Sequence, residues 1–248
     1  MTRYGRSVLR HHDGMSATTN RPVHASVPLS PTPRSTLNRR PDRAGTHRRD
    51  LYDVLDAAVI CHFGVVVDGS PLVLPTAFGY DVDGPEEGGT LYLHGSVASL
   101  SLRAAPAQEI CVTFTVLDGL VLARTGFHHS MNYRSAVVIG QPRLVDDRDE
   151  KARALDLVVD HAVAGRSSTL RPHTRKELAA TSVLALALTE ASVKARSGDP
   201  IDDAADLAAG GWAGVIPVRL VATGAVTAAD CIGHEPPADV LARVAALS

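Results

Sequence analysis

The feature that most constrains the fold is a series of short β-rich runs separated by polar turns. The first two runs, 58–67 and 71–80, are joined by Asp68-Gly69, and an Asp-Gly pair between apolar runs indicates a tight hairpin. Further runs of this kind cover 90–95, 109–116, 120–127 and 135–145. Strands so close in sequence pair antiparallel, because parallel pairs need long crossovers, so the pattern favours an antiparallel barrel.

Helical periodicity lies mostly outside this series. It covers 48–58, a stretch that begins near Asp147, and a shorter one from Thr174 to about Ser182. The last two open with the spacing of a capping box. Two more strands are expected at 184–197 and 212–222. Runs of strands followed by helices are not βαβ alternation, so the predicted fold class is mainly β with flanking helices, and not a doubly wound parallel sheet.

A second Asp-Gly pair and the distribution of charge complete the outline. Asp118-Gly119 predicts another hairpin, between 109–116 and 120–127. Residues 1–50 contain ten Arg and three Asp, against a formal net charge of −2 for the whole chain. The rest is therefore mildly acidic and offers no broad basic footprint, which makes nucleic acid an unlikely partner.

Residues 1–45 show neither helical nor strand periodicity and are predicted to form a disordered basic tail. The tail is interpreted as a solvated segment. Contact of this tail with nucleic acid or with an acidic surface, or a wrong start with Met15 as the alternative, stays open. Three cysteines lie far apart without a CxxC motif, which argues against disulfides or zinc and fits a cytoplasmic protein. The chain shows no apolar run of membrane-spanning length.

The stretch TLYLHGSVASLSLR carries the chemistry most suggestive of a ligand. A strand ends at His94-Gly95-Ser96, and a helical stretch with Ser99 and Arg103 follows. The unpaired N–H groups at a helix start attract anions, glycine allows close backbone approach, and arginine adds a charged fork. The residues alone leave two interpretations open, a phosphate site and an ordinary turn with Ser96 as N-cap.

Six segments occur in the order found in FMN-binding split-barrel proteins. They are PLVLPTAFG, LYLHGSVASLSLRA, ICVTFTVLDGLVLARTGFHHSMNYRSAVVIGQPRLV, ELAATSVLAL, SVKARSGDPIDD and WAGVIPVRL. Over about residues 40–222 the chain resembles the pyridoxamine 5'-phosphate oxidase superfamily, and within it the nitroimidazole-resistance group of flavin-binding proteins. The resemblance implies a six-stranded antiparallel split β-barrel over 46–225 and a C-terminal extension, 226–248, with a short helix. It also implies a homodimer with FMN in two clefts at its interface.

The resemblance further implies roles for individual residues. Those expected to bind the cofactor are Pro75, Thr76 and Ala77 near the flavin ring; His94, Gly95, Ser96, Ser99 and Arg103 near the ribityl phosphate; Tyr133, Arg134 and Ser135 from the partner subunit; and Lys194 and Trp212 in segments that close the cleft. The vitamin-forming oxidase carries an arginine-rich signature where this chain has WAGVIPVRL, so oxidation of pyridoxamine phosphate is not expected.

Histidines and one arginine carry the remaining alternatives. His94 is the first candidate for catalysis, because histidine exchanges protons near neutral pH, although it could simply hydrogen-bond a turn or the cofactor. Some split-barrel relatives bind haem through a histidine, and the candidates here are His62, His94, His128 and His129. His128 and His129 have no Asp, Glu or Cys residues nearby in the spacing of a metal site, so no metal site is predicted. Arg134 could pair with phosphate or with an acidic residue.

The leading hypothesis is an FMN-dependent oxidoreductase that passes electrons from reduced flavin to a small electrophile, such as a nitro-aromatic compound, a quinone or O₂. One alternative is a haem-binding or haem-degrading protein on the same barrel. Another is a flavin-binding regulator or carrier without turnover. A deazaflavin in place of FMN also stays open.

Overall fold

The structure, a computed structural model, describes residues 28–29 and 32–248. Most of the predicted tail, residues 1–27 and 30–31, lies outside the described residues. The rest of that segment packs on the body. Leu29 is buried, and Arg34 forms ion pairs of 2.6 Å with Glu109 and 2.7 Å with Glu190. The prediction of disorder is therefore wrong for residues 32–45.

The larger of two antiparallel sheets has six strands in the order β2-β1-β5-β6-β9, with β10 paired to β5 as well. Its strands are β1 (Cys61–Val67), β2 (Ser70–Thr76), β5 (Ile110–Leu122), β6 (Ser130–Gly140), β9 (Ala191–Arg196) and β10 (Gly214–Pro217). The hairpin predicted at Asp68-Gly69 is confirmed, since it joins β1 to β2 and both residues have positive φ, 49° and 77°.

The smaller sheet has four strands in the order β3-β4-β8-β7, again antiparallel. They are β3 (Phe78–Asp81), β4 (Thr90–Ser96), β8 (Thr181–Ala187) and β7 (Arg143–Leu144). The mainly β fold with antiparallel sheets is thus confirmed, although the described residues form ten strands where the sequence predicted eight. Three predicted strands each divide in two, since 71–80 breaks at Ala77, 135–145 breaks after Gly140 and 184–197 breaks between β8 and β9, while 109–116 and 120–127 join into β5.

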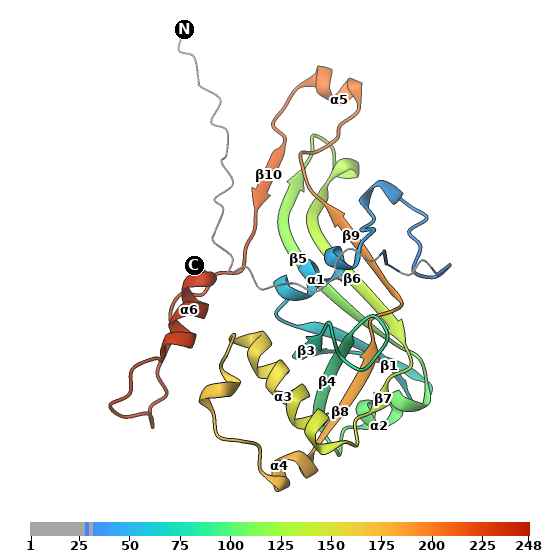
Figure 1. Ribbon diagram of the computed structural model, residues 1–248. Helices are drawn as coiled ribbons and strands as arrows, with labels where there is room; N and C mark the ends of the chain where they lie inside the picture. Colours follow the sequence, from blue (N-terminus) through green and yellow to red (C-terminus); the bar gives the residue numbers. More distant parts are fainter. Residues whose placement is uncertain (1–27, 30–31) are drawn as a thin grey trace.

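The helices flank the sheets, as Figure 1 shows. They are α1 (Arg48–Ala57), α2 (Leu100–Ala104), α3 (Arg148–Ala162), α4 (Arg175–Ala180), α5 (Ala204–Ala209) and α6 (Ala238–Ala246), with short 3₁₀ turns η2 (Pro41–Arg43), η3 (Ala105–Ala107), η4 (Gly126–His128) and η5 (Ser167–Thr169). Both predicted caps form: Asp147 accepts a hydrogen bond from the Glu150 N–H, and Thr174 and Glu177 make a reciprocal capping box. No helix in the described part of the chain is long and apolar enough to cross a bilayer.

The main core lies between the two sheets and α1. Phe78 of the smaller sheet meets Phe114 of the larger one edge to face, with ring centroids 4.8 Å apart. Leu91 and Leu93 of β4 enter this core, whereas Tyr92 between them enters a second cluster with Ala154 of α3. Successive side chains of β4 therefore lie on opposite sides of the smaller sheet, and α3 covers its outer face.

One hairpin prediction is wrong. Asp118-Gly119 does not turn the chain, because β5 runs through it as a single strand with a register shift against β6 between Leu117 and Gly119. The extra residue is a β-bulge, which bends a strand without ending it.

Candidate functional site

The strand register brings two groups of predicted site residues together. Phe78 pairs with Leu93, so Ala77, at the start of β3, lies beside His94 at the end of β4. Just before it, Thr76 ends β2 and donates its hydroxyl hydrogen bond to the Ala77 carbonyl at 3.2 Å. The predicted flavin-ring residues Pro75, Thr76 and Ala77 therefore adjoin the predicted phosphate residues within one chain. We call this region, 75–77 with 94–103, the β4–α2 junction.

His94 is the chemically distinctive residue of the junction. Its side chain is half-buried, and its Nδ1 is fully buried without a hydrogen-bond partner among the described residues. Burial lowers the pKa of the imidazole below its usual value. A neutral ring at pH 7 donates protons poorly but offers a nitrogen lone pair, so this environment favours ligation over acid catalysis.

Gly95 has a packing role that sequence reasoning missed. A Cβ built on this residue would lie 2.8 Å from Leu102 Cδ1, below any ordinary contact distance. The glycine thus makes room for α2 to pack against β4. The prediction that it lets the backbone approach a ligand is left without support, because a side chain of the same chain occupies that space.

The helix of the junction starts later and is shorter than predicted. Its N-cap is Ser99, whose Oγ accepts from the Leu102 N–H at 3.5 Å, and not Ser96, whose Oγ accepts from the Ala98 N–H at 3.2 Å. A helix of five residues has little dipole to offer an anion. The Arg103 side chain is exposed, and its guanidinium forms no hydrogen bond or ion pair with the described residues. An anion at the junction would therefore depend on this guanidinium and the Ser96 hydroxyl.

The residues predicted to come from a partner subunit lie in β6 of the larger sheet, whereas His94–Ser96 lie in β4 of the smaller one. Ser135 of β6 faces Lys194 of β9 and donates its hydroxyl to the Lys194 carbonyl at 3.2 Å, with Tyr133 two residues before it. Arg134 donates two hydrogen bonds, of 3.0 and 2.8 Å, to the Asp118 carboxylate of the same chain. Of its two interpretations, pairing with an acidic residue is the one seen. Its side chain also lines a pocket of about 360 Å³ beneath η2.

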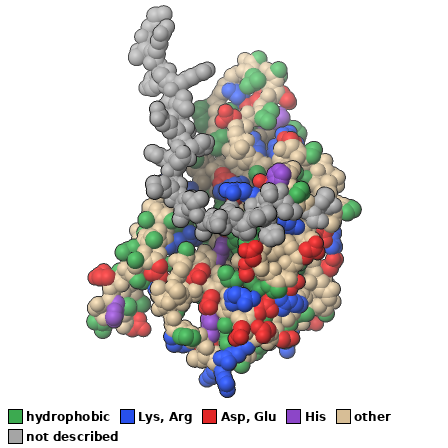
Figure 2. Space-filling view, viewed as in Figure 1, with side chains coloured by type: hydrophobic (Ala, Val, Ile, Leu, Met, Phe, Trp, Pro, Cys, Tyr) green, Lys and Arg blue, Asp and Glu red, His purple; other side chains and the backbone are tan. Residues whose placement is uncertain are grey.

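Trp212 lies apart from both groups. It precedes β10 and is 69% exposed. We call the part of the molecule at the top of Figure 1, which includes η4, α5 and β10, the upper lobe. Figure 2 shows other hydrophobic side chains on the surface of this lobe. A single chain does not bring Trp212 to the β4–α2 junction.

The other histidines differ in their surroundings. His62 pairs across β1–β2 with Pro75, so it adjoins the junction. His129 Nδ1 bonds the Thr125 carbonyl at 2.7 Å, and His128 lies in the upper lobe, 3.3 Å from Asp203.

Sequence reasoning missed His161. It is partly buried in α3, with its ring 4.1 Å from that of Phe78 and its Nε2 2.8 Å from the Ala58 carbonyl. Its spacing of three from Val158 and seven from Ala154, both buried, could have placed it on the covered helix face.

Comparisons with known proteins agree with this fold. Residues 47–195 match the family model described as pyridoxamine 5'-phosphate oxidase. The flavocytochrome Anf3 from Azotobacter vinelandii is 36% identical over 87% of this chain and 98% of that chain, with a TM-score of 0.78. The FAD and heme binding protein from Mycobacterium smegmatis is 38% identical over 81% of this chain and 97% of that chain, with a TM-score of 0.74.

A candidate 5-nitroimidazole antibiotic resistance protein from Bacteroides thetaiotaomicron shares the fold, at 23% identity and a TM-score of 0.50 over 61% of this chain and 85% of that chain. A comparison with curated proteins gave no match. The family match spans more than half of the chain, and two structures above 30% identity cover most of it. The resemblance read from the sequence is confirmed, and the chain belongs to the pyridoxamine 5'-phosphate oxidase family.

Proposed function

We propose that this protein is a flavin-dependent oxidoreductase that also binds haem, and that the His94 imidazole would hold the iron. The proposal draws on the two structures of 36% and 38% identity, one a flavocytochrome and the other an FAD- and haem-binding protein. Haem, an alternative to flavin in the sequence analysis, thus becomes a second cofactor beside it.

The observation that carries the haem assignment is the unpartnered Nδ1 of His94. Buried nitrogens nearly always have a hydrogen-bond partner, so a buried one without any calls for an explanation. A ring that burial keeps neutral has the protonation state that a metal ligand needs. Because a half-turn of the ring exchanges each nitrogen with a ring carbon, the proposal concerns the imidazole and not one named nitrogen.

For the flavin, the residues of the junction fit a phosphate and an apolar ring. Arg103 and the Ser96 hydroxyl are free to bind a phosphate. Val97 and Leu100 beside them are 45% and 57% exposed, which leaves apolar surface for a ligand to cover. When bound, a flavin supplies the electron transfer, and the protein binds, orients and shields it from water. FMN and FAD share the ring and the first phosphate, so both fit these contacts.

We also propose that the cofactor sites are completed in a homodimer. β2 is an edge strand whose Leu72, Val73 and Leu74 are 41%, 66% and 37% exposed. An exposed apolar edge strand invites pairing with another chain. A second copy would supply the Tyr133–Ser135 segment, which within one chain lies in β6 of the larger sheet and not in the sheet of β4.

The decisive experiment is an absorption spectrum of the purified protein, before and after haem titration, with mass spectrometry of the released ligand. We expect flavin bands and a Soret band. His94→Ala should abolish the Soret band, whereas His129→Ala, which removes an exposed histidine of the same chain, should keep it. A Soret band that survives His94→Ala would reject the ligand assignment.

The flavin contacts are tested separately. Ser96→Ala combined with Arg103→Ala should weaken flavin retention at least tenfold, since a charge-assisted bond and a neutral bond are lost together. Unchanged retention would remove the junction from the flavin site. Oxidation of the reduced protein by a quinone, a nitro-aromatic compound or O₂ distinguishes an oxidoreductase from a carrier, because a carrier would bind flavin without turnover.

A further inference from the structure

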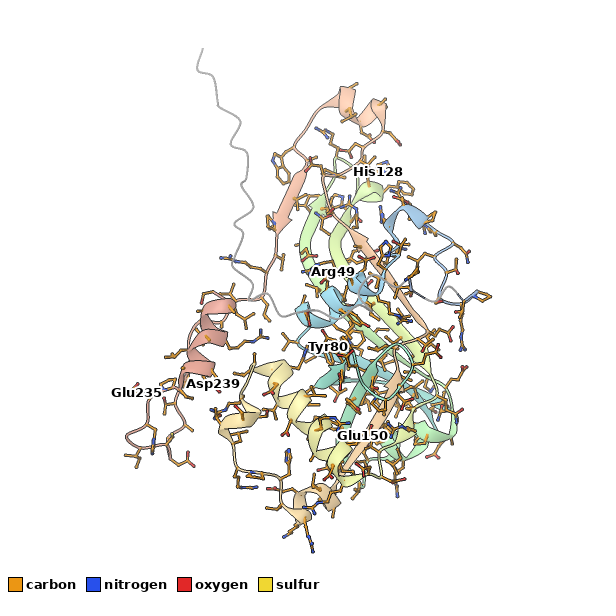
Figure 3. The ribbon with its side chains drawn as sticks, in the orientation of Figure 1. Arg49, Tyr80, His128, Glu150, Glu235 and Asp239 are labelled. Carbon is orange, nitrogen blue, oxygen red and sulfur yellow. The ribbon has the colours of Figure 1, made fainter. Side chains whose placement is uncertain are left out.

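The upper lobe contains a group of metal-ligating side chains far from His94 in the fold. It forms where η4, between β5 and β6, meets α5 (Figure 1), and Figure 3 labels its histidine there. One donor atom each from His128, Asp203 and Asp206 lies within 4.8 Å of the other two. The two aspartates are three residues apart at the start of a helix, a spacing that places them on one face.

Asp203 is oriented in an unusual way for its position. It is the N-cap residue of α5, where an aspartate normally accepts a hydrogen bond from the helix backbone, yet its side chain makes no such bond. Its Oδ2 lies instead 3.3 Å from His128 Nε2. The carboxylate thus faces the imidazole and does not make the stabilising cap that is usual at this position.

The local charge balance is negative. Asp202 beside the group is already paired: its side chain is 1% exposed and accepts from the Arg124 guanidinium at 2.7 Å and from the Arg124 N–H at 3.0 Å. That pair anchors the segment and neutralises one carboxylate. Neither Asp203 nor Asp206 has an arginine or lysine partner within the described residues. Two carboxylates this close repel each other unless a cation lies between them.

We propose that His128, Asp203 and Asp206 bind a divalent transition-metal ion of the zinc type, with water completing the coordination. An imidazole with two carboxylates suits zinc, cobalt or nickel better than magnesium or calcium, which prefer an all-oxygen shell. The ion would tie α5, and with it the connection from β9 to β10, to η4 between β5 and β6. It would leave the cofactor chemistry at His94 untouched.

The test is a zinc titration of the full-length protein after dialysis against EDTA, followed by isothermal calorimetry and by metal analysis of the washed protein. We expect one bound ion per chain, and at least a tenfold loss of affinity in His128→Gln and in Asp206→Asn. His129→Gln is the matched control, because it removes the neighbouring histidine, which bonds the Thr125 carbonyl, and should bind zinc as the parent does.

A structural readout accompanies the affinity. Zinc should slow proteolysis within residues 198–212 in the parent and in His129→Gln, but not in His128→Gln. Magnesium should give neither effect. The proposal is overturned if zinc binding does not saturate, if it is equal in His128→Gln and His129→Gln, or if magnesium competes at equal concentration. Thermal denaturation without metal checks that each variant is folded.

Discussion

Gly79 of β3 is the position where one methyl group should matter most. A Cβ there would lie 2.7 Å from the Val158 backbone nitrogen and 2.8 Å from the Leu157 carbonyl carbon, both in α3. Backbone atoms of a packed helix cannot rotate aside as a side chain can. Gly79→Ala must therefore lift α3 from the smaller sheet, and overpacking of this kind costs about 1–3 kcal/mol. The loss of chain entropy in the unfolded state returns about 0.4–1 kcal/mol.

From the middle of each range, the net expectation is a loss of about 1.3 kcal/mol, which in a protein of this size lowers Tm by about 3–5 °C. Urea denaturation followed by circular dichroism should show a lower midpoint with an unchanged slope. Gly126→Ala is the matched control, because a Cβ there meets nothing within 4 Å, and it should fall within about 0.5 kcal/mol of the parent. A Gly79→Ala protein as stable as Gly126→Ala would show that α3 does not rest on β3.

Three further perturbations probe other parts of the fold. Phe114→Ala removes a fully buried ring in edge contact with Phe78 and should cost about 3–5 kcal/mol in urea denaturation, so a loss below 1 kcal/mol would contradict the packing of the two sheets. Thr174→Ala removes the N-cap of α4 and should cost about 1 kcal/mol by the same measurement, and an unchanged midpoint would show that the cap contributes nothing. Burial lowers the pKa of His161 and of His94, so the unfolded chain binds protons more readily and stability should fall as pH drops below about 6.5. Thermal denaturation at pH 7.5 and 5.5 measures this loss, which should be smaller in His161→Gln; an equal loss in that variant would exclude His161 as a source.

Two identical dipeptides show what local sequence can and cannot predict. Asp68-Gly69 turns the chain, whereas Asp118-Gly119 is a bulge inside β5. At the second pair β5 has neighbours on both sides, since β6 continues past it and β10 packs so closely that a Cβ on Gly119 would lie 3.0 Å from Val215 Cγ1. The dipeptide shows only a local preference for a turn. Pairing with strands distant in sequence decides whether a turn or a bulge forms.

Contacts with residues distant in sequence also explain the break between β8 and β9. No glycine or proline interrupts 184–197, so the sequence predicted one strand. The chain nevertheless passes between the sheets at Leu188–Glu190, where the buried Arg48 donates to the carbonyls of Leu188 and Thr189 and Arg34 pairs with Glu190. The partners come from residues about 140 to 156 positions earlier, and a window along the sequence cannot contain them.

In the candidate site, too, the local sequence predicted only the features that depend on near neighbours. The residue types and their order predicted the strand end at positions 94–96 and a short helix with Arg103 after it, because each depends on neighbours within a few residues, but they named Ser96 and not Ser99 as the cap. The packing of Gly95 on Leu102 and the position of Ala77 beside His94 depend on the register of β3, β4 and α2, which no local pattern sets. The unpartnered nitrogen of His94 belongs to this second kind of feature. It is produced by burial in the assembled sheet, so the property that most favours a metal ligand at position 94 exists only in the folded chain.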